Sequence, residues 1–207
     1  MAKRQNARFN LENTLQRDGY ARVAGVDEVG RGCLAGPVCA AAVVLDPDAR
    51  VSGLRDSKLL SAKARERLYD EITVTSDWNV SEVSVAQIDQ LNIRQASLLA
   101  MRKAVMALKV PPDFVIVDGF LMSELPFPQK AIIGGDRKCA SIAAASIVAK
   151  VTRDRLMTWL HQKDPRYGFD RHKGYPTVDH LDALETFGYS NLHRRSFKPR
   201  RLFPRPD

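Results

Sequence analysis

The sequence has few cysteines, no long hydrophobic run and no apolar segment near its first residue. Its three cysteines, Cys33, Cys39 and Cys139, are odd in number and form no Cys-x-x-Cys pair. A disulfide framework uses an even set and a zinc site needs closely spaced ligands, so the sequence indicates neither. We therefore expect buried or half-buried thiols in a reducing cytoplasm.

Two further absences concern membranes. No apolar run approaches the length that crosses a bilayer. The first five residues, MAKRQ, are basic but lack the apolar segment of a signal peptide. We therefore expect a cytoplasmic protein with no membrane partner. Separately, we expect the protein to act as a monomer.

The length and composition suit one folded unit. Hydrophobic residues make up 44% of the 207 residues, which excludes a disordered chain and provides for a proper core. We expect a single domain over residues 1–207. It includes a small helical extension from about residue 164 and a basic, extended tail over residues 193–207.

Apolar runs and helical periodicity alternate along the chain, which predicts an α/β fold with a mixed sheet. The expected strands lie at residues 23–29, 38–45, 114–118 and near 132, with one or two more within 72–85. The expected helices cover residues 11–17, 61–70, 88–108 (as one helix or two), 140–161 and 177–187. The helix over 140–161 is dense in small residues, which predicts close packing against the sheet. Its basic residues Lys150, Arg153 and Arg155 either reach phosphates or form a solvated face.

The segment with the most chemical content is residues 23–32, VAGVDEVGRG. It reads as a buried strand that carries Asp27 and Glu28. Burying unpaired acids costs free energy, so this pair needs protons, a cationic partner or a metal ion. The glycines allow the backbone to approach a phosphate closely. Two readings follow: a metal site that grips a phosphodiester, or an edge strand with solvated acids and an ordinary turn.

Two more acids sit at the ends of apolar runs beside glycine. Asp118 follows the run FVIV, and Asp136 follows AIIGG. Strand ends are where the rigid elements of α/β sheets converge on a ligand. Hard cations such as Mg²⁺ prefer carboxylate oxygens, and two of them roughly 4 Å apart promote phosphodiester cleavage. Asp154 competes with Asp136 for this role, the alternative being a salt bridge within its own helix.

Side chains alternate along a strand, so Asp27 and Glu28 need a local twist to face one centre. If they join Asp118 and Asp136, the 32 basic residues face 20 remaining acids, a net charge of +12. A basic surface around an acidic centre suits a polyanionic substrate. Excess lysine and arginine is common among unrelated proteins, so charge alone assigns no function.

The whole pattern resembles ribonuclease HII, the bacterial type 2 ribonuclease H. The matching blocks fall in order over roughly residues 11–198. They are GVDEVGRG at 25–32, LAGPV at 34–38, DSK at 56–58, VDG at 117–119, GD at 135–136, SIAAASIVAKVTRDR at 141–155, YGF at 167–169, HKGYPT at 172–177 and HRRSF at 193–197.

The resemblance implies a ribonuclease H-like fold, a central mixed five-stranded sheet flanked by helices. It also implies a metal-dependent endoribonuclease that uses Mn²⁺ or Mg²⁺, with two ions bound. Its substrates would be RNA–DNA hybrids, whose RNA strand is cut, and duplex DNA with embedded ribonucleotides. The metal-binding acids it implies are Asp27, Glu28, Asp118 and Asp136.

Substrate-binding residues carry over from the same resemblance. Gly30, Arg31 and Gly32 are similar to the family's Gly-Arg-Gly, which grips the ribonucleotide and its 2′-hydroxyl. Tyr175 corresponds to the tyrosine that stacks beside the RNA–DNA junction. Lys58 would lie near the scissile phosphate.

The sequence also departs from the family pattern. Cys33 stands where proline is usual, Gly134 where lysine is frequent, and Tyr189 where proline commonly follows glycine. None of these is one of the four acids, so the departures bear on loop rigidity or phosphate affinity.

Two other functions are compatible with these residues. One is another ribonuclease H-fold nuclease, such as a junction resolvase, and the other is a basic nucleic-acid-binding module whose acids are structural. Metal-dependent cleavage separates an enzyme from a module, and a requirement for a 2′-hydroxyl separates a ribonuclease from a resolvase. The four histidines have no metal-ligand spacing and are interpreted as surface or structural residues.

Overall fold

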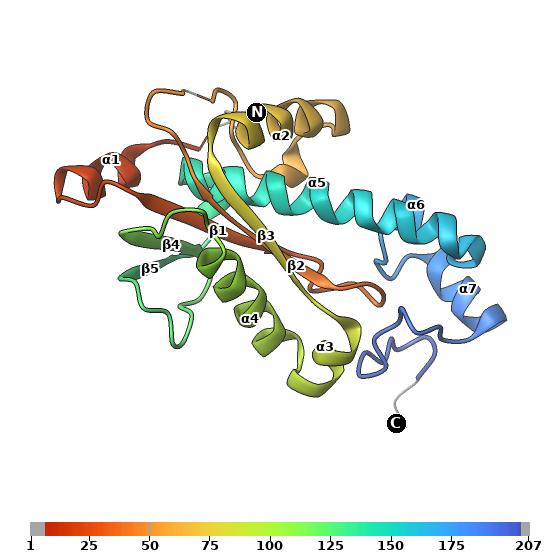
Figure 1. The fold of residues 1–207 in the computed structure, drawn as a ribbon. Helices are drawn as coiled ribbons and strands as arrows, with labels where there is room; N and C mark the ends of the chain where they lie inside the picture. The colour runs from red at the N-terminus through yellow and green to blue at the C-terminus, as the bar shows by residue number, and fades with distance from the viewer. Residues whose placement is uncertain (1–6, 50, 204–207) are drawn as a thin grey trace.

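The computed structural model describes residues 7–49 and 51–203. Its centre is one five-stranded sheet in the order β3-β2-β1-β4-β5 (Figure 1). The strands are β1 (Val23–Val29), β2 (Val38–Val44), β3 (Asp77–Val83), β4 (Phe114–Asp118) and β5 (Gln129–Ile132). Strands β1, β2 and β3 pair antiparallel, whereas β1, β4 and β5 pair parallel. The predicted mixed sheet is confirmed, and β1 lies at its centre, so the reading of residues 23–29 as an edge strand is wrong.

Helices cover both faces of the sheet because β2 is apolar on both of its faces. Ala40 and Ala42 belong to the core formed with α4 (Ile93–Met106), and Ala41 and Val43 to the core formed with α2 (Ala62–Thr75) and α5 (Ala140–Lys163). Alternate side chains of a strand point to opposite faces, which produces these two layers. Figure 1 shows α4 on one side of the sheet and α2 and α5 on the other.

The long helix α5 packs closely on β1, as its small residues predict. A Cβ added to Gly25 would lie 2.1 Å from the backbone carbon of Ser141, so only glycine fits there. Ala143, Ala144 and Ala145 are fully buried. This contact fixes the start of α5 against the strand that carries Asp27.

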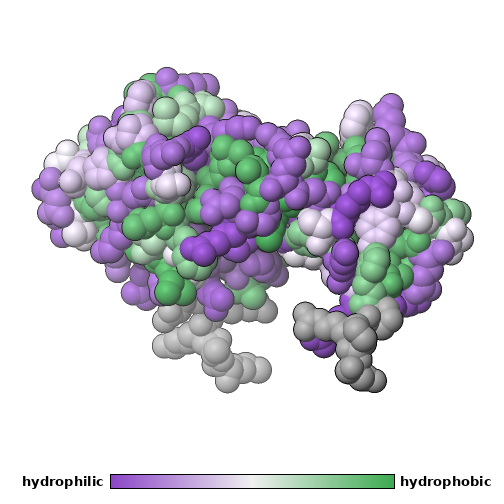
Figure 2. All heavy atoms as spheres, turned by 90° about the horizontal axis from the view of Figure 1, so that it is seen from below, coloured by the Kyte–Doolittle hydropathy of each residue, from purple (hydrophilic) through white to green (hydrophobic). Residues whose placement is uncertain are grey.

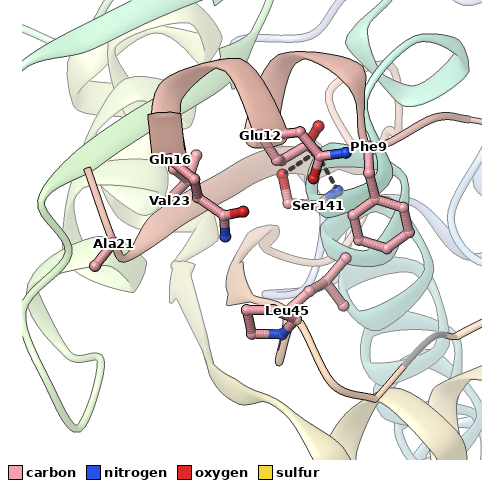
Figure 3. A pocket seen from close by; sticks show the side chains of 9 residues that line it. Phe9, Glu12, Gln16, Ala21, Val23, Leu45 and Ser141 are labelled. Atoms are coloured by element: carbon pink, nitrogen blue, oxygen red, sulfur yellow. Dashed lines mark hydrogen bonds between the residues drawn. The ribbon is translucent and has the colours of Figure 1, made fainter. Parts of the chain in front are cut away.

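Helix α1 (Asn10–Arg17) joins the same junction from the N-terminal side. The carboxylate of Glu12 accepts hydrogen bonds from the backbone N–H and the hydroxyl of Ser141, at 2.9 and 2.8 Å, and thereby caps α5 (Figure 3). The cavity drawn in Figure 3 has a volume of about 340 Å³ and lies between α1, the start of β1 and the end of β2. It is a junction between elements at the opposite end of β1 from Asp27.

Some predicted elements need correction. Helix α2 continues to Thr75 rather than ending at residue 70, so Ile72 is a buried helical residue and residues 72–85 contain one strand. The helical interval after β3 divides into α3 (Val85–Leu91) and α4. The break is Asn92, whose φ is +68° and whose side chain caps α4 through the N–H groups of residues 94 and 95.

The C-terminal extension follows α5 and contains α6 (Phe169–His172) and α7 (Val178–Phe187). In Figure 2, seen from below, it forms a smaller lobe beside the main body. Its core includes three buried histidines. The rings of His172 and His180 stack 4.5 Å apart, and His180 Nε2 lies 3.0 Å from His193 Nε2. We predicted surface or structural histidines, and the structure places these three in the core of the extension.

The tail differs from the extended segment that we predicted. Residues 193–203 form turns, and Arg194 is fully buried. The tail bends inward because its backbone pairs with residues 34–36: the Arg194 N–H donates to the Leu34 carbonyl and the Gly36 N–H to the Leu192 carbonyl, both at 2.8 Å. Residues 204–207 of the predicted tail lie outside the described residues.

Candidate active site

The four predicted acids lie where neighbouring elements end. Asp27 and Glu28 are near the carboxyl end of β1, and Asp118 is the last residue of β4. Strands β1 and β4 are parallel, with Val26 opposite Val117, so their carboxyl ends share one edge of the sheet. Asp136 follows β5 in a short 3₁₀ turn, Gly135–Arg137.

Hydrogen bonds hold these carboxylates in place. The Gly135 N–H donates to Asp118 Oδ1 at 2.8 Å, which ties the end of β4 to the turn that carries Asp136. The Glu28 N–H donates to Asp27 Oδ1 at 2.8 Å. Asp27 and Asp136 retain only 7% and 5% of their accessible surface, so both are buried acids.

The acids at this edge act on one another electrostatically. Burial raises the pKa of Asp27 well above its ordinary value, and the negative charges of Glu28 and Asp118 raise it further. Burial also raises the pKa of Glu28, Arg31 opposes this shift, and the charge of Asp118 adds to it. The pKa of Asp136 is raised by burial, by Asp56 and by Asp118. The four acids therefore form one electrostatic cluster.

Strand β1 carries Asp27 and Glu28 next to each other without a β-bulge. The pairing with β2 stays regular, with Asp27 opposite Ala41 and Glu28 opposite Ala40. Asp27 lies beside the Ser146 hydroxyl of α5, which lowers its pKa, whereas Glu28 accepts from Arg31 Nη1 at 3.0 Å. The two acids thus have different partners, although the charge of Asp118 acts on both.

A fifth acid, Asp56, belongs to the cluster and was not among the predicted acids. It is buried, and its charge raises the pKa of Asp136. Arg137 Nε lies 3.8 Å from Asp56 Oδ2 and 3.9 Å from Asp136 Oδ1, which places it between the two acids. The only sequence signal for Asp56 is its place in the DSK block, since no apolar run precedes it.

A cavity of about 340 Å³ adjoins the cluster and brings several predicted residues together. Asp27, Glu28, Lys58 and Tyr175 line it, with Lys150 on the facing side of α5. The ammonium of Lys150 lies 5.8 Å from the centre of the Tyr175 ring. Asp118 and Asp136 are not among its lining residues, so the cavity brings together only part of the predicted site.

The glycine-flanked Arg31 lies in the turn after β1. Gly30 has a φ of +91°, and a Cβ there would lie 2.3 Å from Arg153 Nε, so both conformation and space require glycine. The side chain of Arg31 keeps 43% of its accessible surface while it pairs with Glu28. A Cβ on Gly32 would meet no atom within 4 Å, so the backbone there faces open space.

The basic residues of α5 behave differently from one another. Lys150 pairs with Asp154 at 2.8 Å, which confirms the salt-bridge interpretation of Asp154. Arg155 pairs with Glu66 of α2. Arg153 is fully buried, so it is neither a phosphate contact nor part of a solvated face.

The donor set fits hard divalent cations. In residues 7–49 and 51–203, Asp27 and Asp118 make no ion pair, although like charges surround them. Clustered carboxylates with raised pKa values are stabilised by a cation that prefers oxygen ligands, as Mg²⁺ and Mn²⁺ do. In the same described part of the chain, no three acid, histidine or cysteine side chains already stand at ligating distance.

The mixed sheet in the order β3-β2-β1-β4-β5, with acids at or near the carboxyl ends of β1 and β4, places the chain in the class of ribonuclease H-like folds. The family model described as Ribonuclease HII matches residues 24–200. The chain therefore belongs to the ribonuclease HII family and is an endoribonuclease of the ribonuclease H type. This membership excludes both the non-catalytic module and the resolvase.

Relatives and solved structures agree with this assignment. The chain is 55% identical to ribonuclease HII of Ruegeria pomeroyi, over 92% of this chain and 82% of that protein. It is 48% identical to ribonuclease HII of Caldicellulosiruptor saccharolyticus, over 91% and 93%. Ribonuclease H2 of Pyrococcus horikoshii OT3 superposes with a TM-score of 0.71 at 27% identity, over 86% and 94% of the chains. The PCNA:RNase HII complex of Archaeoglobus fulgidus gives 0.74 at 29% identity, over 86% and 96%.

In the part of the chain that the structure describes, no helix is both long and apolar enough to span a bilayer.

The three cysteines are buried free thiols, and burial raises the pKa of Cys39 and of Cys139 to about 12. This confirms the prediction of buried or half-buried thiols.

Proposed function

We propose that this endoribonuclease depends on divalent metal ions, cuts the RNA strand of RNA–DNA hybrids and incises duplex DNA at embedded ribonucleotides. The observation that carries the proposal is the convergence of Asp27, Glu28, Asp118 and Asp136 at one sheet edge. Burial and neighbouring negative charges raise the pKa values of Asp27, Glu28 and Asp136, and added positive charge would offset this repulsion. We take residues 1–207 as a single catalytic unit.

The four acids would hold two Mn²⁺ or Mg²⁺ ions. When bound, such a pair activates a water molecule and stabilises the leaving oxygen of a phosphodiester. The chain's own part is to hold the carboxylates on rigid strand ends. Asp118 is fixed by the Gly135 N–H, and Asp27 by the Glu28 N–H, so little reorganisation is needed at the moment of reaction.

The residues around the cavity would bind the nucleic acid. Lys58 faces the cavity and supplies positive charge for the scissile phosphate. Tyr175, half-buried beside it, offers a ring face for stacking on a base or sugar. Gly30, Arg31 and Gly32 place backbone groups where a 2′-hydroxyl is read.

The test uses three duplexes of one sequence: a uniform RNA–DNA hybrid, a DNA duplex with one ribonucleotide, and an all-DNA duplex. Each is incubated with Mn²⁺, Mg²⁺ or a chelator, and the product ends are mapped. We expect cleavage of the first two, none of the third, and none with chelator. Cleavage in chelator would refute metal dependence, and equal cleavage of all-DNA duplex would refute recognition of the 2′-hydroxyl.

A further inference from the structure

The loop that joins β1 to β2, residues 30–37, is held by two fully buried arginines. Arg153 comes from α5 and Arg194 from the C-terminal tail, and both have 0% of their accessible surface exposed. Within residues 7–49 and 51–203, neither forms an ion pair. Both guanidinium groups instead donate to backbone carbonyls.

Arg194 holds both ends of the loop. Its Nη1 donates to the Arg31 carbonyl at 3.0 Å, and its Nε and Nη2 donate to the Gly36 carbonyl at 3.0 and 2.9 Å. The backbone N–H of Arg194 also donates to the Leu34 carbonyl. Three guanidinium bonds and one backbone bond therefore set the path of the chain on both sides of Gly32.

Arg153 links the same loop to the segment that carries Tyr175. Its Nε donates to the Pro37 carbonyl at 3.0 Å and its Nη2 to the Ala35 carbonyl at 3.1 Å, while Nη1 donates to the Lys173 carbonyl at 2.9 Å. The Leu34 N–H donates in addition to the Gly174 carbonyl at 2.8 Å. The loop and Tyr175 are thus held in one network.

The tail that carries Arg194 is anchored from outside by Asp89 of α3. Asp89 accepts from the backbone N–H groups of Arg195 and Ser196, both at 2.9 Å, and from the Ser196 hydroxyl at 2.5 Å. These bonds lie next to Arg194 in the chain. Asp89 makes no contact with the loop itself in the bonds described, so it acts on the loop only through the tail.

We infer that Arg194 is a positioning residue that sets the Gly30-Arg31-Gly32 loop against Tyr175, so that the C-terminal tail contributes to selection of a ribonucleotide. This inference rests on the proposed role of that loop in reading a 2′-hydroxyl. A lone 2′-hydroxyl offers few hydrogen bonds, so its recognition depends on the placement of the loop. A continuous RNA strand offers many productive registers and tolerates a looser loop.

The choice of arginine is physically specific. A guanidinium presents five donors in a rigid fork, whereas a lysine ammonium is a point charge on a flexible stem. Lysine at residue 194 keeps the charge but cannot bridge the carbonyls of Arg31 and Gly36 in the same geometry. A purely space-filling role for Arg194 would not depend on this fork.

The test measures kcat/KM with Mn²⁺ on a duplex containing one ribonucleotide and on a uniform hybrid. The selectivity is the value for the one-ribonucleotide duplex divided by the value for the hybrid. The variants are Arg194→Lys and Asp89→Ala. The matched control is Arg201→Lys, an exposed tail arginine that pairs with Asp182 and Glu185 of α7. We expect Arg194→Lys to lower the selectivity roughly tenfold or more, since small misplacements of binding groups cost up to about 10²-fold. Asp89→Ala should lower it in the same direction by a smaller factor.

Two outcomes would overturn the inference. One is a selectivity for Arg194→Lys equal to that of Arg201→Lys, which includes the case of equal losses on both substrates. The other, if Arg194→Lys does not fold, is an unchanged selectivity for Asp89→Ala. Asp89→Ala provides this second test because Asp89 bonds to the tail at Arg195 and Ser196 and not to the loop. Failure of the wild-type protein to cut the one-ribonucleotide duplex at all would instead refute the proposed function.

Discussion

Replacement of Asp27 by asparagine separates two effects of the acidic cluster. Asparagine keeps the shape of the side chain but removes a charge from the group that would hold the metal ions. We expect cleavage of a uniform hybrid to fall by roughly 10³-fold or more, about 4 kcal/mol of transition-state stabilisation. The fold should survive, because the substitution relieves repulsion from Glu28 and Asp118.

The raised pKa of Asp27 determines whether Asp27→Asn stabilises or destabilises the metal-free protein at a given pH. The pKa of Asp27 in the folded, metal-free protein lies well above the unfolded value of about 3.9. The stability that its protonated carboxyl contributes is therefore present below about pH 3.9 and lost as the pH rises through the folded pKa. At pH 7 the metal-free Asp27→Asn variant should be more stable than wild type, and near pH 4 the difference should vanish.

Metal binding should reverse this order. At a free Mn²⁺ concentration 100 times Kd, wild type should gain about 2.7 kcal/mol, which corresponds to about 5–11 °C in Tm for a chain of this size. The Asp27→Asn variant should gain much less, because it has lost a ligand.

The assay combines hybrid cleavage with thermal unfolding at pH 4 and pH 7, with and without Mn²⁺. Asp70→Asn is the control, since Asp70 is exposed on α2. Near wild-type turnover in Asp27→Asn would refute the metal-ligand role. A lower metal-free Tm than wild type at pH 7, with Asp70→Asn unchanged, would refute the repulsion argument.

Three further predictions concern the substrate and the extension. Tyr175→Ala should lower the rate of incision at a single ribonucleotide by roughly tenfold to hundredfold, because a stacking interaction of ~1–3 kcal/mol is lost. Tyr175→Phe, which keeps the ring, should lower it by less. An unchanged rate for Tyr175→Ala on the one-ribonucleotide duplex would make Tyr175 a packing residue. Removal of residues 199–207 should reduce the slope of log binding constant against log salt by about one unit per lost phosphate contact. An unchanged slope in a hybrid titration would show that the tail does not touch nucleic acid. Burial lowers the pKa of His180 to about 4 and of His193 to about 3, so the stability of their neutral forms is lost as pH falls below about 6.5. Amide-exchange protection of α7 should therefore decline from pH 6.5 to pH 4, and constant protection would contradict the argument.

The sequence by itself determined the layers of the fold and the identity of the main acids. Strands and helices differ in hydrophobic period, so the β1, β2 and β4 segments and α5 were predictable from local pattern. Asp27 and Asp118 were predictable as neighbours because each lies at or near the carboxyl end of a buried strand, with a glycine a few residues away at most. Where local pattern was ambiguous, as at Ile72, tertiary burial decided that the residue extends α2 rather than starting a strand.

Only the tertiary structure decided which polar residues are buried and what they hold. In the sequence, Arg153 and Arg194 look like ordinary members of basic segments, yet both are enclosed and bonded to carbonyls. Asp56 has no signal beyond its place in the DSK block and Glu12 has none, and the partner of Glu12, Ser141, lies 129 residues away. Hydrophobic periodicity reports which face of an element is apolar. A buried hydrogen bond instead depends on two distant segments meeting at about 3 Å, and no local pattern encodes that meeting.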